Sequence, residues 1–101
     1  MIYKVKAKFI DGKRKEFLEL LHSTKLKNQK PDGSYIIDAM KRAIIDHKGL
    51  VRWTELCYCP TPLAHERGTV YDKYFTDIET EPIKKHETFE GKSFMDKIFV
   101  N

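Results

Sequence analysis

A chain of 101 residues, 41% hydrophobic and 34% charged, has the size and composition of one globular domain rather than of a disordered segment. No apolar run approaches the roughly 20 residues of a membrane-spanning helix, and lysines interrupt the apolar residues near the N-terminus. Neither a membrane span nor a secretory signal peptide is therefore predicted. We expect a single domain over residues 1–101, located in the cytoplasm.

The first half of the chain predicts one strand followed by two helices. Residues 2–10 alternate apolar and lysine side chains, which is typical of a strand with one buried face and one solvated face. Apolar residues recur at helical spacing over 13–24 and again over 34–42. The polar segment 25–32 between them indicates a loop, and 43–45 is expected to be extended.

The second half predicts two further strands separated by a short helix. Residues 50–59 are rich in strand-forming residues. A helix of one or two turns is expected to begin after Thr61 and to end at Gly68. A long strand should follow over residues 70–83, and a last helix should begin near Gly91.

Glu55 interrupts the apolar face of the second predicted strand. That inward face is expected to contain Val51, Trp53, Cys57 and Cys59. A carboxylate in this position suggests a bulge, an edge position or a functional group, and the sequence leaves these three explanations open.

Two rows of opposite charge predict which strands are neighbours. One face of the first strand carries Lys4, Lys6 and Lys8. One face of the last strand carries Phe75, Asp77, Glu79 and Glu81. Because opposite charges on adjacent strands attract, we expect these two strands to pair with the rows facing each other. The predicted fold class is α+β, with two layers and a three-stranded, mostly antiparallel sheet covered on one face by helices.

The two cysteines, Cys57 and Cys59, are separated by a single residue. A disulfide between them would be strained and would close a very short loop. Free thiols in a reducing compartment are the simpler interpretation, which agrees with a cytoplasmic location.

The segment 52–72 holds the densest group of reactive side chains, at the end of a strand and along the short helix after it. The candidate ligand-binding residues are Arg52, Glu55, Cys57, Cys59, His65, Glu66, Arg67 and Tyr71.

Three kinds of chemistry fit this segment, and ordinary structural roles fit it as well. Arg52 and Arg67 near a helix start favour a bound anion. A cysteine thiolate beside His65 would satisfy the requirements of an activated nucleophile. Two thiolates and an imidazole are zinc ligands, but two cysteines one residue apart are an unusual spacing for zinc. Cysteines that fill the core and charges that face water explain the same residues, so we assign no metal ligand and no cofactor.

Basic residues concentrate in the first half of the chain, which raises the question of a nucleic-acid partner. Against this, the net charge is only +4, and the aromatic residues Tyr3 and Phe9 fall on the buried face of their strand. Nucleic-acid binding is therefore not the favoured interpretation, although it stays open.

Residues 57–67 have the sequence Cys-Tyr-Cys-Pro-Thr-Pro-Leu-Ala-His-Glu-Arg, followed by Thr-Val-Tyr-Asp-Lys-Tyr-Phe at 69–75. With these residues, and with 29–33 and 40–43, the chain resembles a family of short uncharacterised bacterial proteins. The resemblance implies a compact α+β fold and a bacterial cytoplasm. It implies no activity and no site.

The sequence thus leaves the function unknown, with a small binding or interaction protein as the leading hypothesis and the segment 52–72 as its anion- or ligand-binding corner. A small enzyme that uses a cysteine and His65 is the first alternative, and a nucleic-acid-binding protein is the second. A homodimer is expected to be feasible, because a partly exposed sheet invites pairing between copies.

Overall fold

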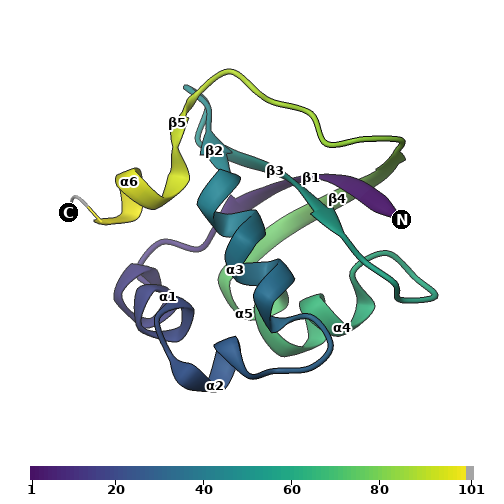
Figure 1. Cartoon of the computed structure of the whole chain (residues 1–101). Helices are drawn as coiled ribbons and strands as arrows, with labels where there is room; N and C mark the ends of the chain where they lie inside the picture. Colours follow the sequence, from purple (N-terminus) through teal and green to yellow (C-terminus); the bar gives the residue numbers. More distant parts are fainter. Residues whose placement is uncertain (100–101) are drawn as a thin grey trace.

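An antiparallel sheet with the strand order β4-β1-β3-β2-β5 organises the molecule (Figure 1). The computed structural model describes residues 1–99, so the last two residues of the predicted domain lie outside the described part. The α+β class and the antiparallel pairing are confirmed, but within residues 1–99 the sheet has five strands instead of three. The strands are β1 (Ile2–Phe9), β2 (Ile44–Ile45), β3 (Leu50–Leu56), β4 (Phe75–Ile83) and β5 (Lys92–Ser93).

The helices gather on one side of this sheet, as Figure 1 shows. They are α1 (Arg14–Leu21), α2 (Thr24–Lys27), α3 (Gly33–Arg42), α4 (Ala64–Glu66), the π-helical turn η1 (Arg67–Tyr71), α5 (Asp72–Tyr74) and α6 (Phe94–Phe99). Phe17 of α1 and Ile36 of α3 are fully buried in the same core cluster as Val5 and Trp53 of the sheet. Within the described residues, no helix combines the length and the apolar character needed to cross a membrane.

The two charged rows meet across β1 and β4, which confirms the predicted neighbours. The pairs and their nitrogen–oxygen distances are Lys4–Glu81 at 3.8 Å, Lys6–Glu79 at 3.6 Å and Lys8–Asp77 at 3.8 Å. These side chains are partly or largely exposed, so each pair contributes only a few tenths of a kcal/mol, up to about 1 kcal/mol. They are consistent with the observed register of β1 against β4, in which Lys4 lies opposite Glu81 and Lys6 opposite Glu79.

A bulge in β4 changes the face on which Phe75 lies. The pairing shifts between Lys6 opposite Glu79 and Lys8 opposite Thr76, so β4 has one extra residue there, and Asp77 adopts a left-handed φ of 54°. Phe75 consequently turns into the core while the acidic row stays on the outer face. The prediction that Phe75 shares a face with this row is wrong, because strict alternation does not pass through a bulge.

The chain from Ala64 to Tyr74 is helical, which corrects two predictions. The helix begins at Ala64 rather than after Thr61, and it continues through Gly68 and a π-helical turn instead of ending there. The predicted strand over residues 70–83 begins only at Phe75. Val70, Tyr71 and Tyr74 are β-formers by propensity, but here their burial under the sheet decides their conformation.

The segment predicted as a loop over residues 25–32 contains the short helix α2. Ser23 caps it, accepting a hydrogen bond from the Leu26 N–H at 3.2 Å, and Leu26 is buried. The next helix begins at Gly33, where an added Cβ would lie 1.9 Å from the Leu26 carbonyl oxygen. This close approach needs glycine, and it places the preceding Asp32 inside the molecule at 3% exposure.

The two additional strands, β2 and β5, extend the sheet on the β3 side. The extended segment 43–45 forms β2, which pairs with β3 and with β5. The last helix begins at Phe94 rather than near Gly91, because Lys92 and Ser93 pair with β2 first.

Candidate functional site

A pocket of about 300 Å³ opens where β3 ends, between the start of α3 and α4. Its polar lining residues are Asp32, Cys57, Cys59, His65 and Glu66. Its apolar and aromatic lining residues are Pro31, Tyr35, Leu56 and Tyr58. Small pockets with apolar walls and a few convergent polar groups are typical of ligand-binding sites.

Pairing with the N-terminus holds Cys57 in place. The Cys57 N–H donates to the carbonyl oxygen of Met1 at 2.9 Å, and the Met1 ammonium donates to the Cys57 carbonyl oxygen at 3.1 Å. These bonds extend the β1–β3 ladder one step beyond Leu56. Because side chains alternate along a strand, Cys57 points towards the same inner side as Trp53 and is 2% exposed.

A left-handed residue turns the chain back towards this cysteine. Leu63 has a φ of 55°, is fully buried, and accepts a hydrogen bond from the Arg67 N–H at 2.7 Å. A left-handed backbone costs a non-glycine residue about 1–2 kcal/mol, so it persists only where the surroundings determine it. Immediately after this turn, α4 begins and brings Glu66 against the cysteines.

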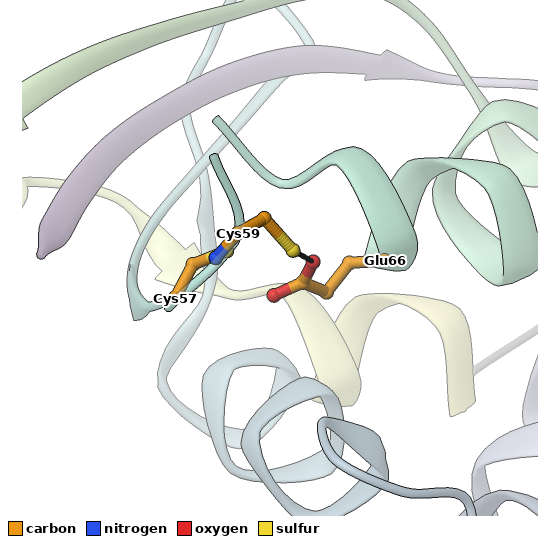
Figure 2. Close-up of side chains that lie close together, drawn as sticks. All are labelled: Cys57, Cys59 and Glu66. Atoms are coloured by element: carbon orange, nitrogen blue, oxygen red, sulfur yellow. Dashed lines mark hydrogen bonds between the residues drawn. The ribbon is translucent and has the colours of Figure 1, made fainter. Parts of the chain in front are cut away.

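Cys57, Cys59 and Glu66 form a compact cluster, drawn in Figure 2. The two sulfur atoms and a carboxylate oxygen all lie within 4.8 Å of one another. The Cys59 thiol donates to Glu66 Oε1 at 3.3 Å, and the Cys59 N–H donates to the Cys57 sulfur at 3.3 Å. Cys57 and Glu66 are buried, whereas Cys59 is partly exposed to the pocket.

The environment keeps Cys57 protonated in the free protein. Burial raises the pKa of the Cys57 thiol to about 12, although the backbone amides of Cys59 and Leu63 act in the opposite direction. The nearby Glu66 and Cys59 side chains raise it further. Cys57 is therefore a poor nucleophile at neutral pH, because the thiolate is the reactive form.

His65 and Asp32 form a second polar pair in the pocket. His65 Nδ1 lies 2.5 Å from Asp32 Oδ2, and the other oxygen of Asp32 accepts from Gln29 Nε2 at 2.7 Å. The buried carboxylate thus fixes the orientation of the imidazole ring. Over residues 1–99, His65 Nε2 has no hydrogen-bond partner, so it is available to a group in the pocket.

Glu55 lies behind the pocket, in the core. Its Oε1 accepts hydrogen bonds from Trp53 Nε1 at 3.0 Å and from the Tyr71 hydroxyl at 2.5 Å. Its Oε2 is buried without a hydrogen-bond partner among the described residues. Burial raises the pKa of Glu55 to about 8, more than the hydrogen bond from Tyr71 lowers it. The β1–β3 register runs without a shift through the pair Tyr3 and Glu55, so this carboxyl group does not lie in a bulge.

The structure brings together half of the candidate residues predicted from the sequence. Four of them line the pocket: Cys57, Cys59, His65 and Glu66. Glu55 and Tyr71 are hydrogen-bonded to each other in the adjacent core. Arg52 pairs with Asp46 at 3.4 Å and Arg67 pairs with Asp72 at 2.9 Å, and neither arginine lines the pocket.

Sequence reasoning missed the contribution of α3. Asp32 and Tyr35 line the pocket, whereas the sequence predicts only a loop over residues 25–32 and gives no sign of a site there. The hydrogen bond to His65 joins residues that are 33 positions apart, and no local pattern reports such a contact. The exposed Tyr58, whose ring centroid lies 6.4 Å from that of Tyr35, was a neighbour of the predicted site without being assigned to it.

Known proteins offer no assignment for this pocket. No family model matches the chain, and comparisons with curated proteins and with solved structures found no match either. The resemblance to short bacterial proteins stays a prediction, and the chemistry of the pocket is the basis for a functional assignment.

Proposed function

We propose that this chain is a small binding protein whose ligand is a thiophilic divalent cation, best matched by Zn²⁺, held by Cys57, Cys59 and Glu66. The observation that supports it is the gathering of two sulfur atoms and one carboxylate oxygen within 4.8 Å. Thiolates and carboxylates bind zinc at about 2.0–2.3 Å, so small side-chain movements would bring these atoms into contact with one ion.

The environment of Glu66 favours a positive charge in this position. Glu66 is 1% exposed, and the Cys59 thiol donates a hydrogen bond to its carboxylate. A thiol is a weak donor, and an ionised carboxylate removed from water is unfavourable unless it is well paired. A cation bound between the carboxylate and the sulfurs would supply that pairing.

The surrounding charges also favour a cation over an anion. Asp32 and Glu66 are acids that line the pocket, whereas Arg52 and Arg67 pair with carboxylates elsewhere. Thiolates select soft and borderline ions, and a carboxylate favours a divalent ion over Cu(I), so the mixed donor set fits Zn²⁺, Co²⁺ or Cd²⁺. Both cysteines are free in this structure, as the proposal requires, since a disulfide would consume both sulfur ligands.

A cysteine-dependent enzyme is the second candidate function. It is favoured by the partial exposure of Cys59, by its hydrogen bond to Glu66 and by the His65–Asp32 pair in the same pocket. An activated thiolate, however, is normally stabilised by a nearby positive charge. The Glu66 carboxyl group beside Cys59 has the opposite effect, so this candidate is the weaker one.

The amount of zinc that the protein retains after dialysis tests the proposal directly. Metal-free protein is equilibrated with Zn²⁺, dialysed against buffer without metal, and analysed for zinc per chain. We expect the wild-type protein to keep one equivalent, and Cys59→Ser and Glu66→Gln to lose it while remaining folded by circular dichroism. Glu81→Gln, which alters an exposed carboxylate on the outer face, is the matched control and should retain the metal. Wild-type protein without zinc, or Glu66→Gln with a full equivalent, would refute the proposal.

A further inference from the structure

Building on the proposed function, we infer that the cation site is open towards the pocket and binds a small neutral aromatic ring with a nitrogen donor, of the imidazole or pyridine class. Zinc in proteins is usually four-coordinate, and three protein ligands leave one position for water or an added ligand. Cys57, Cys59 and Glu66 all line a pocket of about 300 Å³, so a ligand in that pocket can reach an ion bound to them.

His65 is the residue that would otherwise complete the coordination. Its ring is bound through Nδ1 to Asp32, and its nitrogen atoms are not part of the group gathered within 4.8 Å. A hydrogen bond from an imidazole to a buried carboxylate fixes the orientation of the ring. His65 therefore stays at the pocket wall, where Nε2 can contact a ligand bound to the cation.

The charge of the site selects a neutral ligand. Two thiolates and one carboxylate more than neutralise a divalent cation, and the buried Asp32 adds a further acid to the same pocket. An anionic ligand such as azide would add like charge to a site that is already negative, which is unfavourable. A neutral nitrogen donor completes the coordination without adding charge, and imidazole nitrogen is a good ligand for these ions.

The aromatic and apolar lining of the pocket fits an aromatic ring. The rings of Tyr35 and Tyr58 lie 6.4 Å apart at an angle of 64°, and Pro31 and Leu56 extend this apolar surface. Aromatic rings pack well against one another in offset and edge-to-face arrangements. A volume of about 300 Å³ is at the small end for ligand pockets, so one small ring fits better than a drug-sized molecule.

Visible absorption of the Co²⁺-substituted protein tests the inference. We expect imidazole and pyridine to change the Co²⁺ bands saturably, and azide to require at least about tenfold higher concentration. Tyr58→Ala removes an exposed aromatic wall and should weaken imidazole binding about threefold to tenfold, with the ligand-free Co²⁺ spectrum unchanged. His65→Gln should also weaken imidazole binding and leave the ligand-free spectrum unchanged, whereas Glu81→Gln should alter neither.

Three results would overturn the inference. A Co²⁺ spectrum that no added ligand changes would mean that the coordination is closed. A ligand-free spectrum altered by His65→Gln would mean that His65 is itself the fourth ligand. A protein that binds no Co²⁺ at all would refute the proposed function and this inference together, whereas the first two results would leave the cation site intact.

Discussion

The thiol of Cys59 lies 3.3 Å from Oε1 of the buried Glu66, so a carboxylate removed from water has a weak sulfur donor as its hydrogen-bond partner. A thiol is a weak hydrogen-bond donor, so this contact satisfies the carboxyl group poorly. The arrangement becomes favourable when a cation lies between the two groups.

Glu66→Gln should change the free energy of unfolding with opposite signs in the two metal states. In metal-free protein the variant should be no less stable than the wild type, because it replaces a poorly paired carboxylate with a neutral amide. With Zn²⁺ at about 100 times its dissociation constant, the wild type should gain about 2.7 kcal/mol and the variant much less. Urea unfolding with and without Zn²⁺ measures both effects, and equal zinc stabilisation of the two proteins would contradict the account.

The raised pKa of Glu55 predicts how the stability of the metal-free protein depends on pH. Its pKa is raised from 4.5 to about 8 in the folded state, so the folded protein holds a proton there that the unfolded chain releases. The stabilisation is fully present below pH 4.5 and is lost as the pH rises towards 8. The total effect is on the order of a few kcal/mol.

Glu55→Gln is the variant that isolates this effect. Its amide oxygen can still accept from Trp53 and Tyr71, but it does not titrate. The stability of the wild type relative to this variant should therefore fall between pH 4.5 and 8. Urea unfolding midpoints of both proteins, measured across this pH range, test this difference in stability. If the two midpoints change in parallel with pH, Glu55 does not keep its proton in the folded state.

The two cysteines should react with iodoacetamide at different rates in native metal-free protein near neutral pH. Cys59 is partly exposed, whereas Cys57 is buried with a pKa raised to about 12. Peptide mass spectrometry should find Cys59 modified first and both cysteines protected when Zn²⁺ is added. In urea the two should react alike, and equal rates in the native protein would rule out the buried environment of Cys57.

Exchanging the charges of one ion pair tests whether the charged rows on the outer face of the sheet stabilise the protein. Lys6→Glu and Glu79→Lys each place like charges opposite each other and should destabilise the protein, whereas the double exchange should recover most of the loss. The coupling between the two sites should be about 0.2–1 kcal/mol in urea unfolding. Additive effects of the single changes would mean that the pair does not contribute to strand pairing.

The long strands could be predicted because their signals are local and repeated. Alternation over residues 2–10 identifies β1, and the rows of opposite charge identify β4 as its neighbour. The strands β2 and β5 have two residues each, too few to show a period. The helical start of the segment before Phe75 and the bulge at Asp77 depend on burial and pairing, which sequence patterns do not report.

The candidate site was only partly predictable. Cys57, Cys59, His65 and Glu66 are reactive residues close together in the sequence, and they line one pocket. Their geometry depends on the left-handed turn at Leu63, a residue type that gives no sign of that conformation. The contribution of Asp32 comes from a distant helix start and appears only in three dimensions.

X-ray absorption at the zinc edge identifies the atoms that surround the bound ion. For the zinc-loaded protein we expect two sulfur neighbours at about 2.3 Å, with oxygen or nitrogen at about 2.0–2.1 Å completing the coordination. Glu66→Gln should lose an oxygen neighbour or fail to bind zinc. A shell without sulfur would contradict the account, and four sulfur neighbours would instead indicate an ion shared between two chains.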